Sequence, residues 1–166
     1  MCPPQSRFTL QPPTSERCIQ SIARINYLHS RYKKAGKISN EDFLYTLAVC
    51  VTEPIRFINQ FEWRRLNDME VNAIGAFWKS LGDAMDIEYK GYLSKDSWKD
   101  GIEFAEDITA WAKNYEVEAM RPAKSNRQLC DPLLDMLIHH VPGFLKPFAA
   151  EAAVALMGDR LREAFL

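Results

Sequence analysis

The sequence predicts an all-α protein, and three observations support this prediction. Apolar residues recur at spacings of three and four, the period of a helix with one buried face. Capping residues precede these stretches, and glycine or proline follows several of them. No alternation of apolar and polar residues with hairpin turns indicates a β-strand. We therefore expect six or seven helices with short connections, forming one domain over residues 14–166.

The first predicted helix begins after a proline-rich segment. Residues 1–13 contain four prolines, so we expect an irregular lead-in there. Thr14 or Ser15 can then cap a helix that runs to about Ala35, because a side-chain oxygen at this position accepts from a free backbone N–H. Gly36 marks its end, since glycine readily adopts the left-handed conformation that closes helices.

A capping box predicts the second helix. Ser39 is followed three residues later by Asp42, so that each side chain can bond the other's backbone N–H. The helix should run through Val51. Pro54 should kink or restart it, because proline lacks the N–H donor and clashes with the preceding turn. Residues 54–61 are expected to continue as a second helical piece.

The third and fourth helices follow in the same manner. Asn67 and Glu70 form another capping box in front of a stretch whose apolar residues repeat at helical spacing. Ser94 or Asp96 is expected to start the next helix, which runs to about Ala119.

Two further helices are predicted near the end of the chain. Ser125 with Gln128 should cap a helix that runs through His140. The sequence "VPGFLKP" then interrupts the pattern, because it combines proline with glycine. An alanine-rich helix is expected from about Phe148 to Phe165, since alanine has the strongest helix propensity.

Composition excludes several classes of function. The 166 residues include 21 basic and 22 acidic side chains, so nothing in the charge indicates a nucleic acid or an anionic membrane as partner. Four cysteines without a CxxC pair suggest neither a disulfide framework nor a zinc site, which favours a reducing compartment. No stretch approaches the ~20 apolar residues of a transmembrane segment. We expect a protein that is soluble as given.

Common catalytic motifs are also absent. The glycines build neither GxGxxG nor GxxxxGK, and no GxSxG nucleophile elbow occurs. The inward-facing Glu-x-x-His pairs of a helical di-iron site are missing as well. His139 and His140 stand at a predicted helix end, where an imidazole commonly bonds the last carbonyls.

His29 stands out because helix periodicity places it among core residues. Five residues of the first helix fall within an arc of ~80°: Cys18, Ile22, Ile25, His29 and Tyr32. A buried imidazole needs partners for its ring nitrogens. It is either a hydrogen-bonded core histidine or, between apolar walls, a ligand for a haem iron. In the second case Lys33 could pair with a haem propionate, and so could Arg24 or Arg31 if the helix is rotated.

Five stretches together resemble a known family: "RINYLHSRYKKAGKIS", "EDFLYTL", "EPIRFINQFEWRRLND", "FWKSLGDAMDI" and "LMGDRLREAF". The sequence from about Pro13 to Phe165 is similar to the oxygenases that include the ER-bound MpaB-type fungal enzymes and the bacterial rubber oxygenases (latex clearing proteins), and most similar to the fungal branch. The resemblance implies a globin-like helical domain. It also implies haem b held by the histidine that matches His29, and cleavage of a C=C bond with O2.

The resemblance extends to other residues and partners. Thr46 falls in a segment similar to the family's Thr-Leu stretch facing the haem, where its hydroxyl could orient O2; alternatively it bonds back to its own helix. The implied partners are O2 and an apolar, isoprenoid-bearing small molecule. Residues 1–13 match nothing in the family, which implies an N-terminally truncated chain, ER-associated if an anchor lies upstream. The alternative is a non-catalytic helical interaction module, or a relic without cofactor or activity.

Overall fold

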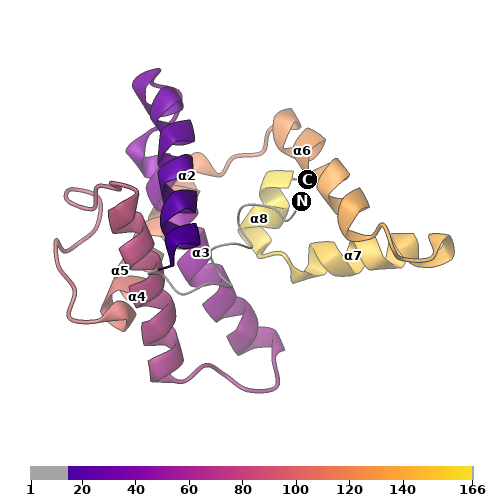
Figure 1. Cartoon of the computed structure of the whole chain (residues 1–166). Helices are drawn as coiled ribbons and strands as arrows, with labels where there is room; N and C mark the ends of the chain where they lie inside the picture. The colour runs from indigo at the N-terminus through magenta and orange to yellow at the C-terminus, as the bar shows by residue number, and fades with distance from the viewer. Residues whose placement is uncertain (1–14, 166) are drawn as a thin grey trace. The chain divides into compact units, whose positions relative to one another are not determined.

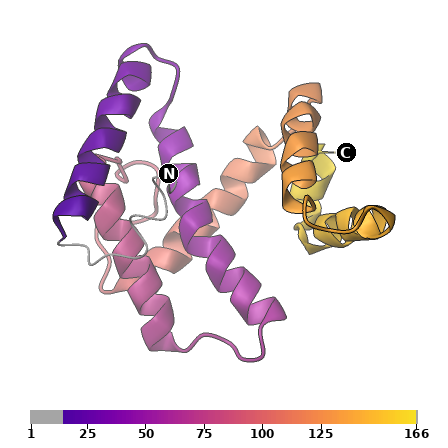
Figure 2. The same cartoon turned by 45° about the vertical axis from the view of Figure 1, so that its right-hand side comes forward.

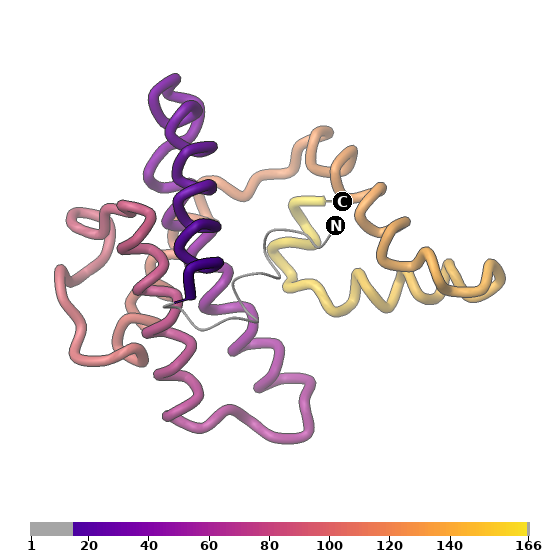
Figure 3. The backbone as a smooth tube through the Cα atoms, in the orientation of Figure 1, coloured from indigo at the N-terminus to yellow at the C-terminus, as the bar shows by residue number. Residues whose placement is uncertain are grey.

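The computed structural model describes residues 15–165, and within them it contains α-helices, one short 3-10 helix and no β-strand. The all-α prediction is confirmed, with seven α-helices in this range (Figure 1). The tube in Figure 3 traces the same path. The chain divides into two compact units, the first ending at Ala112 and the second beginning at Lys113. The expected lead-in over residues 1–13 lies outside the described residues, as does Thr14.

The first unit contains α2 (Glu16–Lys34), α3 (Asn40–Phe61), α4 (Asp68–Ala84) and much of α5 (Gly101–Ala119). Ser15 caps α2, and its hydroxyl accepts a hydrogen bond from the Cys18 N–H at 3.2 Å. The chain leaves α2 at Gly36, whose φ of 64° suits glycine. Figure 2 shows α2 and α3 as a hairpin that follows from this turn.

Both predicted capping boxes are confirmed. The Ser39 hydroxyl accepts from the Asp42 N–H at 3.1 Å, and the Asp42 carboxylate accepts from the Ser39 N–H at 2.8 Å. Asn67 and Glu70 make the same reciprocal pair at 3.0 Å each. These bonds satisfy N–H groups that have no partner inside the helix, and they fix where α3 and α4 begin.

The predicted restart at Pro54 is wrong. α3 runs through this proline as one helix of 22 residues. Val51 before it is fully buried, and Ile55 after it packs against the same core. Apolar packing on both sides therefore holds the helix together despite the missing hydrogen bond.

The start predicted for the fourth helix at Ser94 or Asp96 is also wrong, because α5 begins at Gly101. Ser94 instead donates its N–H and hydroxyl to Asp107, at 3.2 and 2.7 Å. The indole N–H of Trp98 donates to the same carboxylate at 2.9 Å. Burial raises the pKa of Asp107, but these hydrogen bonds outweigh it and the pKa is lowered. The Asp107 carboxylate thus holds the loop between α4 and α5 against α5.

The core of the first unit lies where α3, α4, α5 and this loop meet. Its largest fully buried side chains are Phe104, Leu44, Ile108 and Val51. Trp98 and Tyr89 pack edge-on against Phe104, with ring centroids 5.1 and 5.7 Å away. Such aromatic contacts add to the stabilisation from burial alone.

Two glycines let α4 and α5 approach closely. A Cβ atom on Gly75 would lie 2.6 Å from the Gly101 carbonyl carbon and closer still to its oxygen. The Gly101 N–H donates to the Asn72 side chain at 2.7 Å. The helix crossing is therefore possible only because neither position carries a side chain.

The second unit contains the end of α5, α6 (Lys124–Leu137), the 3-10 helix η1 (Gly143–Leu145), α7 (Lys146–Leu156) and α8 (Asp159–Phe165). The predicted Ser125–Gln128 cap is wrong: α6 follows Ala123 without a side-chain cap and ends before His140. Asn126 instead donates to the carbonyls of Arg121 and Ala164, at 3.0 and 3.1 Å.

The single helix predicted from Phe148 to Phe165 is two helices (Figure 1). α7 ends where Met157 adopts an extended conformation, and α8 begins after Gly158. Glycine in a helix interior costs about 1 kcal/mol relative to alanine, which the alanine-rich composition does not offset here.

Candidate functional site

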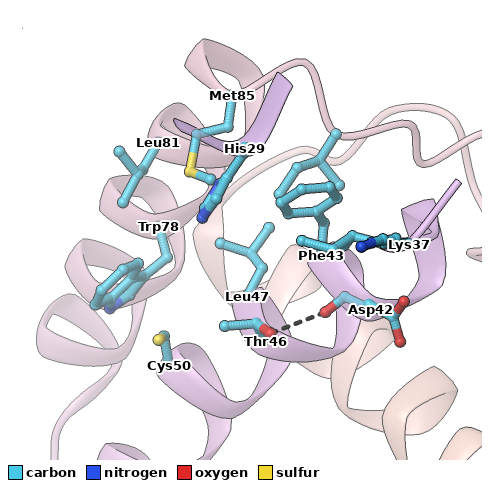
Figure 4. Close-up of a pocket in the computed structure, with 12 residues that line it drawn as sticks. His29, Lys37, Asp42, Phe43, Thr46, Leu47, Cys50, Trp78, Leu81 and Met85 are labelled. Carbon is cyan, nitrogen blue, oxygen red and sulfur yellow. Dashed lines mark hydrogen bonds between the residues drawn. The ribbon is translucent and has the colours of Figure 1, made fainter. Parts of the chain in front are cut away.

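A pocket of about 480 Å³ lies in the first unit, between α2, α3 and α4 (Figure 4). This volume is within the range of small-molecule sites, roughly 300–1,000 Å³. Its walls are mainly apolar and include Phe43, Leu47, Trp78, Leu81, Met85 and Ile87. Its polar lining residues are His29, Lys37, Asp42, Thr46 and Cys50. An apolar molecule with few polar groups suits such a space.

His29 projects from α2 into this pocket, with its ring toward the space between Trp78 and Leu47 (Figure 4). Its Nδ1 is buried, and among residues 15–165 it has no hydrogen-bond partner. The ring packs against Phe43, with centroids 5.1 Å apart. A buried nitrogen left unpaired costs about 1–3 kcal/mol, so a ligand that engages it gains this energy. The first alternative for His29, a core histidine whose ring nitrogens are hydrogen-bonded, is therefore not supported at Nδ1.

The predicted stripe on α2 is buried only in part. Cys18 is fully inside, His29 is half-buried, and Tyr32 is 51% exposed. Arg24 and Lys33, the cations expected beside a haem propionate, are exposed and are not among the pocket's lining residues. Their proposed contact with a propionate stays a prediction.

Thr46 lines the pocket, and its hydroxyl donates to the Asp42 carbonyl at 2.8 Å (Figure 4). This is the bond back to its own helix that was one of the two alternatives. Because the donor is used there, the hydroxyl offers the pocket only its oxygen lone pairs. O2 has no hydrogen to donate, so a hydrogen bond that orients O2 would require this hydroxyl to turn away from the Asp42 carbonyl, and that role stays a prediction.

Cys50 is a polar lining residue that the sequence analysis did not select. Burial raises the pKa of its thiol, so the sulfur keeps its proton at neutral pH. The other acidic group, Asp42, uses its carboxylate in the capping box. The imidazole of His29 is the nitrogen ligand that this lining offers to a metal ion. Phe43, Leu47 and Cys50 share a helical spacing that would have identified the pocket face of α3.

No cluster of three or more histidine, cysteine or carboxylate side chains could hold a metal ion within the described part of the chain. Among the helices of residues 15–165, none combines the length and apolar character needed to cross a membrane.

Comparison with known proteins identifies related sequences. A family profile described as "ER-bound oxygenase mpaB/B'/Rubber oxygenase, catalytic domain" matches residues 8–165. The expectation that residues 1–13 match nothing in the family is therefore wrong for residues 8–13. The ER-bound oxygenase mpaB' of Penicillium brevicompactum is 44% identical over 155 residues, which cover 93% of this chain and 37% of that protein. The ER-bound oxygenase mpaB of Penicillium roqueforti (strain FM164) is 43% identical over 155 residues, covering 93% and 52%.

A further relative, the ER-bound oxygenase mpaB of Penicillium brevicompactum, is 44% identical over 148 residues, covering 86% of this chain and 38% of its own. The chain therefore spans about half or less of the length of the curated relatives it matches. No solved structure matches it. The globin-like arrangement accordingly stays a prediction.

Proposed function

Because the chain belongs to the family of ER-bound oxygenases mpaB/B' and rubber oxygenases, we propose that it binds haem b through His29. We propose further that it takes part in the oxidative cleavage of a C=C bond in an apolar, isoprenoid-bearing substrate. The observation that carries the proposal is the buried Nδ1 of His29, which has no hydrogen-bond partner in the described part of the chain and lies at an apolar pocket of about 480 Å³.

The residues of the pocket fit a haem in chemical terms. An imidazole is a common nitrogen ligand of haem iron, and Nδ1 of His29 makes no hydrogen bond within residues 15–165. The flat faces of a porphyrin are apolar, as are the side chains of Leu47, Leu81 and Met85 in the pocket wall. A haem held there would supply the binding and activation of O2.

The chain's own residues would perform three tasks in this reaction. His29 fixes the cofactor. The apolar walls exclude water and seat the alkene, which contributes ~25 cal/mol per Å² of buried apolar surface. Thr46 can accept a hydrogen bond that orients a small molecule in the pocket. Addition of O2 across the C=C bond with its cleavage gives two C=O groups, so that no further reductant is consumed.

The relatives are named ER-bound, and we propose an association with the ER for this protein as well. Fractionation of cells that express the protein at its natural level tests this directly. Co-sedimentation with ER membranes is expected, and recovery in the supernatant alone would contradict the proposal.

Titration of the purified chain with haemin tests cofactor binding. The chain has three histidines, so the double variant His139→Ala/His140→Ala leaves His29 as the sole imidazole. Both His139 and His140 are exposed in the second unit. We expect a strong, saturable absorption band near the blue end of the visible in the natural chain and in the double variant, and its loss in His29→Ala.

Circular dichroism of each variant serves as the control for folding. A His29→Ala chain that is helical and still gives the same haem band contradicts the assignment of His29. A natural chain that is well folded and gives no band with haemin contradicts haem binding altogether.

A second candidate function is a helical interaction module without a cofactor. It is favoured by the exposed apolar side chains of α6 and η1 in the second unit, among them Leu129, Met136 and Phe144. Apolar groups that are exposed together often mark interaction sites. A colourless, folded chain whose stability does not change with haemin is the result that favours this alternative.

A further inference from the structure

Lys37 is the cationic side chain among the residues that line the His29 pocket. Its backbone is held by the motif that ends α2. The Gly36 N–H donates to the Lys33 carbonyl at 3.1 Å, and the Lys37 N–H donates to the Tyr32 carbonyl at 3.0 Å. These two bonds, with Gly36 in the left-handed conformation, form a Schellman motif. The motif turns the chain from α2 back toward the pocket, which explains why Lys37 and not Lys33 lines it.

The ammonium group of Lys37 is available to an external anion. No ion pair joins it to a carboxylate within residues 15–165. The acidic lining residue, Asp42, uses its carboxylate to accept from the Ser39 N–H and hydroxyl, both at 2.8 Å. Lys37 is exposed, so its charged end can remain hydrated while its methylene groups contact the pocket wall.

We infer that Lys37 pairs with a propionate of the haem in this pocket, an inference that rests on the proposed function. Haem b combines an apolar ring with two carboxylates, which must stay near water or near a cation. The pocket offers the matching pattern: apolar walls from α3 and α4, a nitrogen ligand from α2, and one cation from the loop between α2 and α3. Arg24 and Lys33 lie outside this lining, so Lys37 replaces them as the partner of the propionate.

The rate of haem dissociation tests the ion pair between Lys37 and the propionate, and this measurement requires no catalytic activity. Transfer of haemin from the chain to an excess of apomyoglobin gives the dissociation rate. We expect Lys37→Gln to raise this rate about two- to fivefold, the size expected for an ion pair in contact with solvent. Lys33→Gln, the matched control on α2, should leave it unchanged, and Lys37→Arg should restore the natural rate.

Haemin dimethyl ester separates a charge contact from a structural effect, because its esterified propionates carry no charge. The dissociation rate of the ester should be the same for the natural chain and Lys37→Gln. Equal weakening of haemin and its ester, or an equal effect of Lys33→Gln, overturns the pairing. Tight haemin binding that is insensitive to Lys37→Gln also overturns it but leaves the proposed function intact. A natural chain that binds neither porphyrin overturns both.

Discussion

The two units of this chain differ sharply in how deeply they bury their apolar side chains. In the first unit, Leu44, Val51 and Phe104 are fully buried in one continuous core. In the second, the buried apolar residues among those described are Cys130, Ile138 and Ala164. Because burial of apolar surface is the dominant favourable term in folding, this core stabilises the first unit. The pocket is lined by helices of the same unit.

The second unit shows the opposite pattern. Large apolar side chains on its helices are exposed, among them Leu129, Leu133, Met136, Leu137, Phe144 and Phe148. Its described contacts include hydrogen bonds from Asn126 to two backbone carbonyls, which contribute about 1 kcal/mol each. Equivalent substitutions in the two units should therefore have very different consequences, and paired variants can test this.

The largest difference is expected between Phe104→Ala and Leu133→Ala. Phe104 is fully buried, so its truncation leaves a cavity and should lower the free energy of unfolding by about 3–5 kcal/mol. Leu133 is 60% exposed, and its truncation should change the free energy by no more than about 0.5 kcal/mol. Urea unfolding measured by circular dichroism gives both values. Equal losses would remove the distinction between the two units.

A smaller difference is expected between Gly75→Ala and Gly143→Ala. The added methyl group at Gly75 collides with the Gly101 backbone, which a side-chain movement cannot relieve. We expect a loss of about 1–3 kcal/mol as α4 and α5 are forced apart. Nothing lies within 4 Å of a Cβ at Gly143 in the second unit.

Tryptophan fluorescence is a suitable measurement for Gly75→Ala, because all four tryptophans precede Lys113 and report on the first unit. Thermal unfolding of Gly143→Ala should coincide with that of the natural chain. A Gly75→Ala variant that unfolds at the same temperature as the natural chain would show that α4 and α5 can separate at this crossing without loss of stability.

The smallest effect is expected for a carboxylate on the surface of the first unit. Hydrogen bonds from the Arg64 side chain and the Asn67 backbone lower the pKa of Glu70 from 4.5 to about 2. The folded state therefore binds this proton more weakly than the unfolded state. The resulting stabilisation is complete above pH 4.5 and disappears as the pH falls toward 2.

Glu70→Gln should accordingly reduce stability slightly at neutral pH and flatten the decline between pH 4.5 and 2. Glu118→Gln in the second unit is the control, since no ion pair with Glu118 occurs within residues 15–165. Melting temperatures across this pH range provide the measurement. Parallel pH profiles for the natural chain and Glu70→Gln would contradict the role of the Arg64 pair.

Signals between near neighbours in the sequence predicted much of this fold. The capping boxes of α3 and α4 join residues three positions apart, so the sequence contains the whole interaction. Two of the failed predictions involve distant partners. Ser94 binds Asp107, 13 residues away, and Asn126 reaches Ala164, 38 residues away. Capping rules cannot include such contacts, because they depend on how helices pack.

The residues of the candidate site also differ in whether a signal within one helix could predict them. Periodicity within α2 indicated that His29 faces inward, and it does line the pocket. Lys37 lies beyond the end of that helix, where the periodicity no longer applies. Its position depends on the turn at Gly36, and that of Trp78 on the packing of α4. Lys37 and Trp78 could therefore be placed beside His29 only once the structure was known.

Imidazole rescue tests the assignment of His29 as the iron ligand most directly. His29→Gly leaves space for free imidazole in place of the missing side chain. We predict that the variant, loaded with haemin alone, loses its haem on gel filtration, and that it keeps the haem when imidazole is present in the solution. A His29→Gly chain that keeps its haem through gel filtration without imidazole would contradict the account.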